Sequence, residues 1–298
     1  MSGKTNISWT DMQWNAVSGC SKVSPGCANC YAEALTKRYA GRPGWPAEFR
    51  PWTPENAAAN VVLHPDRLDA PLHWRTPRRI FVNSMSDLFH ENVPDEFIDE
   101  VLGVTTLAGQ HTFQVLTKRP ERMLEYFRTP DRGTRICLAA APHWSKAPLA
   151  AFAEMVGPEI LPLENVHLGV SVENQHWADE RIPLLLQTPA AVRFVSCEPL
   201  LGPVDLTMLR DGQLDALAGD ARTSAGEIYA GGRGLDWVIC GGESGPHRRP
   251  FDLAWARSLR DQCRAAGVAY FFKQTGALKP GQPSADPELD GCKEFPAQ

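Results

Sequence analysis

The sequence predicts an α/β protein built around a parallel sheet, and two observations support this. Short apolar segments rich in β-branched and aromatic residues recur along the 298-residue chain, and segments with helical periodicity follow most of them. The apolar (43%) and charged (22%) fractions are those of an ordinary globular protein. Alternating strands and helices form βα units whose strands run parallel, as in a doubly wound sheet or a barrel.

The predicted strands and helices alternate along the chain. Strands are expected at residues 13–17, 80–84, 112–116, 166–171, 192–196, 235–240 and 269–272. Helices are expected from about residue 28, over 93–107, from 120, over 176–186 and over 253–266. The sequence marks the start of the helix over 93–107, because Pro94 is followed by the acidic residues Asp95 and Glu96, a pattern typical of the first turn of a helix.

Two segments interrupt this alternation. Residues 129–160 are expected to form a helical insertion, and residues 207–234 a polar, glycine-rich one. Residues 1–275 then make up one α/β domain, and the tail 276–298, rich in proline and glycine, packs across it as a loop.

Charge and hydropathy limit the classes of function. The net charge of −5 argues against a dominant non-specific nucleic-acid surface but leaves room for a local basic channel. The N-terminal residues lack the apolar core of a signal peptide, and no apolar run is long enough to span a bilayer, so we expect a cytoplasmic protein without membrane contact. Thiols stay reduced there, so the eight cysteines are better explained as metal ligands, catalytic groups or core residues than as disulfides.

Polar side chains follow six of the predicted strands, at the point where each strand ends. The carboxyl ends of parallel strands meet at the edge of the sheet where ligands bind. Polar loops and helix starts explain a few such residues, among them Asp95. The residues at this edge are Ser84, Ser86, Asp87, Lys118, Arg119, Ser171, Glu173, Cys197, Glu198, Glu243 and Lys273.

Three cysteines cluster near the N-terminus as C-x6-C-x2-C: Cys20, Cys27 and Cys30. Three thiolates are one ligand short of closing a tetrahedral zinc site or a [4Fe–4S] cluster, and on a cluster the open iron can bind a cofactor. A structural zinc site with a distant fourth ligand is the alternative, although zinc sites usually show two ligand pairs and only one C-x2-C pair is present. Three incidental cysteines are a further alternative.

This loop resembles the cluster-binding loop of radical S-adenosylmethionine (radical SAM) enzymes, in which three cysteines follow the first strand of a barrel. The spacing here is wider than the common C-x3-C-x2-C, and the neighbouring aromatic residue, Tyr31, follows the last cysteine. The whole chain resembles an uncharacterised three-cysteine-motif family frequent in phages and prophages. The matching stretches are 83–90, 116–120, 168–173, 240–245 and 271–274.

The resemblance implies a partial or near-complete (β/α) TIM-type barrel over residues 1–275, with a [4Fe–4S] cluster at the carboxyl mouth of its strands. The free iron would bind S-adenosylmethionine, and one electron from a donor such as flavodoxin or ferredoxin would cleave it to methionine and a 5′-deoxyadenosyl radical. The implied cofactor-binding residues are Ser84, Ser86 and Asp87 for the methionyl amine, Lys118 for the carboxylate, and Ser171 and Glu173 for ribose hydroxyls.

Two residues are catalytic candidates. Glu243 follows Gly241 and Gly242, which let a ligand approach the backbone, although an ion-paired glutamate in a tight turn is the alternative. Cys197 stands at a strand end and is a candidate hydrogen donor to a product radical, with a small buried core residue as the alternative.

The phage context implied by the resemblance favours a modified nucleobase in phage DNA as substrate, changed by rearrangement or bond formation in the host cytoplasm. Arg119, Arg248 and Arg249 would then contact phosphate. Four tryptophans are candidates for stacking on bases, with packing in the core as the alternative explanation: Trp9, Trp14, Trp45 and Trp52. A tRNA-modifying or DNA-repair enzyme is an alternative, as is a non-catalytic zinc-binding module or an iron–sulfur sensor.

Overall fold

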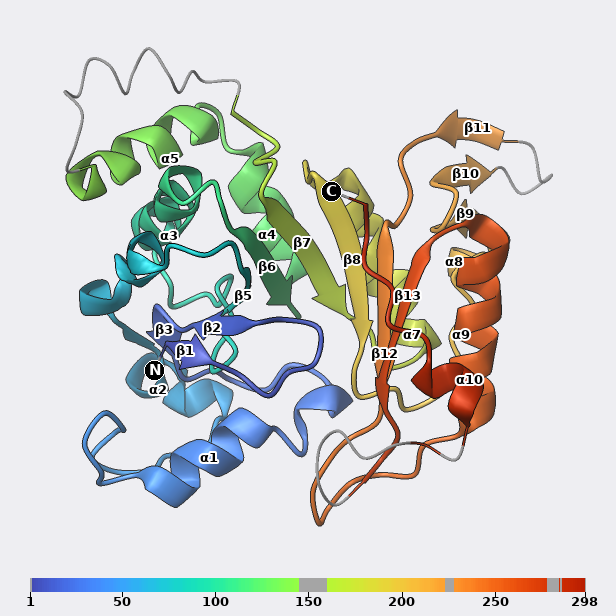
Figure 1. The fold of residues 1–298 in the computed structure, drawn as a ribbon, viewed down its shortest axis with the longest axis horizontal. Helices are drawn as coiled ribbons and strands as arrows, with labels where there is room; N and C mark the ends of the chain where they lie inside the picture. Colours follow the sequence, from blue (N-terminus) through green and yellow to red (C-terminus); the bar gives the residue numbers. More distant parts are fainter. Residues whose placement is uncertain (1, 145–159, 223–227, 278–283, 285, 298) are drawn as a thin grey trace. The chain divides into compact units, whose positions relative to one another are not determined.

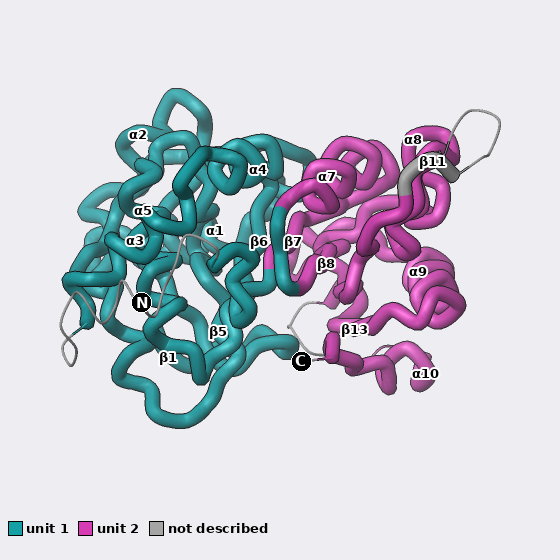
Figure 2. Tube along the Cα trace, turned by 90° about the horizontal axis from the view of Figure 1, so that it is seen from above, with its two compact units in different colours: residues 1–167, 189–191 teal, residues 168–188, 192–298 magenta. Residues whose placement is uncertain are grey.

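The computed structural model describes residues 2–144, 160–222, 228–277, 284 and 286–297. The chain divides into two compact units (Figure 2). Unit 1 comprises Met1–His167 and Pro189–Ala191, and unit 2 comprises Leu168–Thr188 and Val192–Gln298. A mostly parallel eight-stranded sheet has the order β1-β2-β5-β6-β7-β8-β12-β13. The predicted α/β class is confirmed, while the closure of the strands into a barrel stays a prediction.

Unit 1 contributes the strands β1 (Gly3–Lys4), β2 (Met12–Trp14), β5 (Arg79–Val82) and β6 (Thr112–Thr117). The pairs β2–β5 and β5–β6 are parallel, and only the edge strand β1 runs antiparallel to its neighbour. The helices of this unit are α1 (Tyr31–Tyr39), α2 (Ala57–Asn60), α3 (Asp95–Leu107), α4 (Pro120–Arg128) and α5 (Arg132–Ala140), shown in Figure 1.

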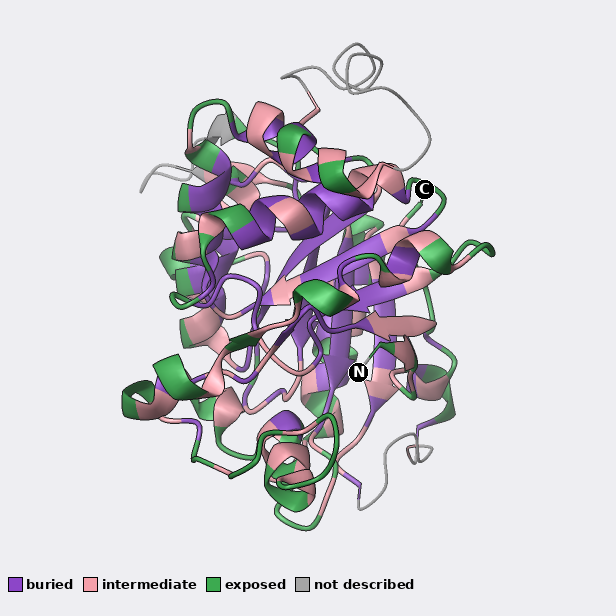
Figure 3. Cartoon of the chain, turned by 90° about the vertical axis from the view of Figure 1, so that its left-hand side faces the viewer, coloured by how far each residue is buried: buried purple, intermediate pink, exposed green. Residues whose placement is uncertain are grey.

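Unit 2 contributes β8 (Val192–Cys197), β12 (Trp237–Gly241) and β13 (Ala269–Gln274), which pair in parallel, and most of β7 (Val166–Ser171). Its helices are α7 (Gln175–Gln187), α8 (Leu209–Gly212), α9 (Leu253–Ala266) and α10 (Pro287–Asp290). Helix α9 packs on β12 and β13. All six residues of β7 are buried, as expected for a parallel strand covered on both faces (Figure 3).

The structure refines several predicted boundaries. The expected strand over 13–17 is two elements, β2 and β3 (Val17–Ser18), and β3 forms a small two-stranded antiparallel sheet with β4 (Val62–Leu63). The helix expected from residue 28 begins at Tyr31, because Pro25–Cys27 first forms a short 3-10 helix, η1.

The predicted insertions and tail are described in part. The segment expected over 129–160 contains α5, and its residues 145–159 lie outside the described part of the chain. The segment over 207–234 contains α8 and a three-stranded sheet of β9 (Leu214–Asp215), β10 (Asp220–Arg222) and β11 (Ile228–Gly231), with 223–227 outside the described part. In the tail, Glu294 donates its backbone N–H to the Tyr270 carbonyl, so residues near 294 lie along β13.

No helix within the described ranges is both long and apolar enough to cross a membrane.

A buried ionic network joins the three helices that follow β5 and β6. The guanidinium of Arg132 on α5 donates to Asp99 Oδ1 (2.7 Å) and to Asp95 Oδ2 (2.6 Å), both on α3. The hydroxyl of Tyr126 on α4 also donates to Asp99 Oδ1 (2.6 Å). The Arg132 side chain is fully buried, so its charge depends on these partners.

Asp99→Ala is expected to lower the free energy of unfolding by about 3–5 kcal/mol, because it leaves the Arg132 charge buried with one of its two carboxylates removed. Urea unfolding measures the loss. Glu96→Ala, on the same helix but with a largely exposed carboxylate, is the control and should change stability by about 0.5 kcal/mol or less. Equal losses in both variants would show that the network contributes nothing specific.

Candidate functional site

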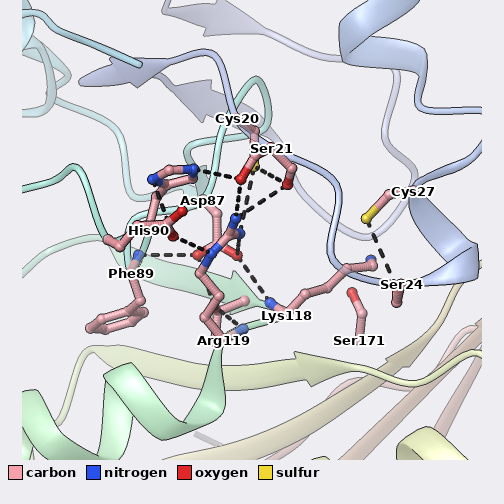
Figure 4. Close-up of polar contacts among 12 residues, drawn as sticks. Cys20, Ser21, Ser24, Cys27, Asp87, Phe89, His90, Lys118, Arg119 and Ser171 are labelled. Carbon is pink, nitrogen blue, oxygen red and sulfur yellow. Dashed lines mark hydrogen bonds and ion pairs between the residues drawn. The ribbon is translucent and has the colours of Figure 1, made fainter. Parts of the chain in front are cut away.

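The centre of the candidate site in unit 1 is a buried ion pair between Asp87 and Arg119 (Figure 4). Asp87 lies in the turn after β5, and Arg119 lies two residues after the end of β6. Because β5 and β6 are parallel neighbours, both residues come to the carboxyl end of the sheet, and Arg119 Nη1 lies 3.2 Å from Asp87 Oδ2. The pair therefore stands at the edge where the sequence predicted ligand binding.

Local hydrogen bonds saturate the Asp87 carboxylate. Its Oδ1 accepts from Thr117 Oγ1 (2.7 Å) and from the backbone N–H of Phe89 (3.0 Å). Its Oδ2 accepts from the backbone N–H of Lys118 (3.0 Å) as well as from Arg119. The sequence assigned Asp87 to the amine of a cofactor, whereas here it fixes the strand-end turns.

Arg119 links this turn to the cysteine loop. Its Nη1 also contacts Cys20 Sγ (3.6 Å), and its Nη2 donates to Ser21 O (3.2 Å) and Ser21 Oγ (3.0 Å). Its Nε donates to Glu91 Oε2 (3.1 Å). Burial opposes the charge, but Asp87, Cys20 and Glu91 outweigh it and raise the pKa of Arg119. All three guanidinium nitrogens have protein partners, so the phosphate contact predicted for Arg119 has no donor available in this arrangement.

His90 completes the network on the other side of Ser21. Its Nδ1 accepts from the Asn92 N–H (3.1 Å), so the proton of the neutral ring lies on Nε2, which donates to Ser21 Oγ (2.9 Å). Burial and then the Arg119 charge lower the pKa of His90. His90 therefore acts here as a neutral hydrogen-bond donor.

The three cysteines lie on the loop between β3 and α1, and all are reduced and partly buried. Burial, with Asp87, raises the pKa of Cys20 to about 12 although Arg119 opposes this, and Cys27 adds a smaller contribution. Burial also raises the pKa of Cys30, while the backbone N–H groups of Glu33 and Ala32 at the start of α1 favour its thiolate. The raised pKa values keep the thiols of Cys20 and Cys30 protonated at neutral pH, and binding a metal would release these protons.

The donor set suits an iron–sulfur cluster, since thiolate is its usual ligand and cations lie beside it. The Lys118 side chain extends toward the stretch that carries Ser24 and Cys27 (Figure 4), and its charge favours the Cys30 thiolate. Among the described residues, no three His, Cys, Asp or Glu side chains already converge as a metal site.

Ser84 and Ser86 lie in the same turn as Asp87. The hydroxyl of Ser84 donates to Gln13 Oε1 (2.7 Å), and that of Ser86 donates to the Val17 carbonyl (2.9 Å). The Ser84 carbonyl accepts from the hydroxyl of Tyr31 (2.6 Å), the aromatic residue that follows the last cysteine. Tyr31 therefore ties the start of α1 to this turn.

The predicted site residues of unit 2 are largely occupied by ion pairs. Glu173 is fully buried and pairs with Arg181 (3.0 Å), which also donates to the Ser171 carbonyl (2.8 Å). Glu243 accepts from the backbone N–H of Arg249 (2.8 Å) and from its guanidinium. These contacts match the alternative of an ion-paired glutamate in a turn, and they engage Arg249 as well.

Cys197 is completely buried, and burial together with the neighbouring Cys240 and Cys263 raises its pKa well above the usual range. This placement matches the alternative of a small core residue. Arg248 is exposed, and its guanidinium donates to the carbonyls of Gly245 and Gly276 (both 3.3 Å). Of the predicted phosphate contacts, Arg248 is the one whose position suits a ligand from solution.

Sequence reasoning missed Ser21, Glu91 and Thr117, which contribute hydrogen bonds to the network. One signal was present, since Ser21 adjoins Cys20 and Thr117 precedes two predicted site residues. Glu91 carries no such signal, because its role depends on the position of Arg119.

Fold and site together define an α/β protein in which hydrogen bonds from Arg119 hold the cysteine-bearing loop against the carboxyl ends of parallel strands. Residues 4–294 match the model of a family described as a protein of unknown function, DUF5131, and the chain belongs to this family. Neither a curated protein nor a solved structure matches the chain.

Arg119→Ala is expected to lower the free energy of unfolding by about 3–5 kcal/mol, because it leaves Asp87 buried without its charged partner. It should also free the cysteine loop, so that Cys20 reacts faster with iodoacetamide, as measured by mass spectrometry. The control is Arg75→Ala, an exposed arginine of the same unit. If Cys20 reacts at the same rate in both variants, Arg119 does not hold the loop.

Neutral His90 makes stability depend on pH. The unfolded chain protonates this residue near pH 6.5, whereas the folded chain does so only at lower pH, so the stabilisation is complete above about pH 6.5 and is lost as the pH falls below it. His90→Asn should therefore lose less stability than the unmodified protein between about pH 7 and pH 5. The control is the exposed His176→Asn, which should keep the original pH dependence.

Proposed function

We propose that this protein is a radical S-adenosylmethionine enzyme that holds a [4Fe–4S] cluster on Cys20, Cys27 and Cys30. The observation that carries the proposal is the attachment of the three-thiol loop to the carboxyl ends of β5 and β6 through Arg119. Three thiolates leave one iron of a cubane cluster without a protein ligand, which is the position a cofactor needs.

When bound, the cluster supplies the electron that cleaves S-adenosylmethionine, and the protein provides binding, orientation and shielding. Arg119 and Lys118 place positive charge beside three thiolates, which offsets the charge of a thiolate-ligated cluster. Asp87 acts as a positioning residue, because its carboxylate is saturated by the protein.

Ser84 and Ser86 are suited to the methionyl amine. Both hydroxyls already donate their protons to protein acceptors, so their oxygen lone pairs are the groups left for a ligand. An ammonium group is a pure donor and matches such acceptors. The half-buried Ser86 is the more accessible of the two. A DNA nucleobase as substrate remains part of the proposal on the strength of the family resemblance.

The deciding experiment is anaerobic reconstitution with iron and sulfide, followed by S-adenosylmethionine, dithionite and quantification of 5′-deoxyadenosine. The unmodified protein should form the product, and Cys27→Ala should abolish it because the cluster loses one of three ligands. The matched control is Cys137→Ala, a cysteine of the same unit that lies on α5 away from the loop. It should retain activity.

Other outcomes separate the rival functions. A brown protein that binds iron and sulfide but never cleaves S-adenosylmethionine would favour a sensor. Zinc in the cysteine loop, with no cluster formed, would overturn the proposal and favour a non-catalytic interaction module.

A further inference from the structure

Unit 1 contains a cavity of about 310 Å³ that the proposed function does not use. It lies between the small β3–β4 sheet, helix α1 and the segment 44–52. Its volume falls at the lower end of the range of small-molecule sites, so it suits a compact ligand and not a folded partner.

The cavity shares a wall with the cysteine loop. Gly19 lines it and directly precedes Cys20. Gly19 has a φ of +82°, and a side chain there would bring a Cβ within 1.8 Å of the Asn60 carbonyl oxygen. On the other side, the backbone N–H of Lys22 donates to the carbonyl of Trp52 (3.1 Å), which also lines the cavity. A ligand in this cavity would therefore lie beside the loop that carries the thiols.

Two tryptophans provide flat apolar surfaces in the lining. Trp52 is only 4% exposed, and Trp45 is half-buried and packs on Tyr39, with ring centroids 5.1 Å apart. By contrast, Trp9 and Trp14 pack in the core against Phe81 and Phe113. Of the four tryptophans that the sequence raised as stacking candidates, the structure thus places Trp45 and Trp52 at a cavity.

The side chains of two arginines in the lining make only long polar contacts with the described part of the chain. Arg50 pairs with the exposed Glu48 at 3.6 Å. Arg67 lies 3.5 Å from the Asn15 carbonyl and 4.0 Å from Asp66, which is also exposed. Contacts of this length are weak, so a phosphate group could replace them with shorter charge-assisted hydrogen bonds.

His64 adds a neutral polar group. Its Nε2 lies 2.8 Å from Ser18 Oγ, and burial, with the Arg67 charge, lowers its pKa to about 4. The imidazole is therefore uncharged at neutral pH, and the positive charge of the lining comes from Arg50 and Arg67, partly offset by Glu48.

We propose that this cavity binds a nucleoside monophosphate unit, with the base stacked on Trp45 and the phosphate held by Arg50 and Arg67. Rings of this kind accept any base through stacking, and guanidinium groups match phosphate geometry. The site is complete without a cluster, so it stands or falls independently of S-adenosylmethionine cleavage.

Isothermal titration of the full-length protein, without cluster reconstitution, tests the site with AMP and dCMP as probes. Both should bind saturably, and adenosine and inorganic phosphate should each bind at least about tenfold more weakly, since each lacks half of the recognised ligand. Trp45→Ala should weaken AMP binding roughly tenfold or more, through loss of stacking. Arg67→Gln should weaken AMP but leave adenosine unchanged.

The exposed Arg75→Gln, in the same unit but outside the lining, is the matched control and should bind AMP like the unmodified protein. Circular dichroism on each variant separates a lost site from a lost fold. The proposal is overturned if neither nucleotide binds the folded protein, or if Arg75→Gln weakens binding as much as Arg67→Gln. Failure of cluster assembly would leave this measurement intact.

Discussion

The buried pair of Asp87 and Arg119 is the interaction on which the candidate site depends. A lone carboxylate or guanidinium at this depth would be strongly destabilising, so each charge requires the other. Asp87 fixes the turns after β5 and β6 by accepting hydrogen bonds from the backbone N–H groups of Phe89 and Lys118. Arg119 in turn donates to the Ser21 carbonyl, which ties the cysteine loop to these turns. One ion pair thereby joins three segments that are remote in sequence.

The same arrangement explains how the cysteine loop is presented. Cys20 is held by Arg119, and Cys30 stands at the start of α1, where backbone N–H groups favour its thiolate. The thiol of Cys27, at the end of η1, makes one long contact in the described part of the chain, with Ser24 Oγ at 3.9 Å. Two of the three thiols are thus held by their surroundings, and the proposed cluster would mainly have to order the third.

Sequence patterns predicted the sheet and the polar edge but not the state of each polar group. Strands such as 112–116 and 192–196 are predictable because local apolar patterns decide them. Arg119 looked like a phosphate ligand because a strand-end arginine gives no sign of its burial. Glu173 likewise looked free, since its partner Arg181 lies in the second turn of α7 and the pairing depends on how that helix packs. Both side chains form ion pairs with residues that the folded structure brings close, and the local sequence around them does not indicate these pairs.

Two regions of unit 1 differ in how completely their charged side chains are paired within the protein. Both carboxylate oxygens of Asp87 and all three guanidinium nitrogens of Arg119 have close partners, so this ion pair holds the cysteine loop in place. In the cavity on the other side of Gly19, Arg50 and Arg67 keep only long contacts beside two tryptophans. Strong internal pairing favours a rigid scaffold and weak internal pairing favours exchange with a ligand. The Lys22–Trp52 hydrogen bond joins the backbone of the cysteine loop to the wall of the cavity, so the rigid cluster and the exchangeable lining meet at one segment of unit 1.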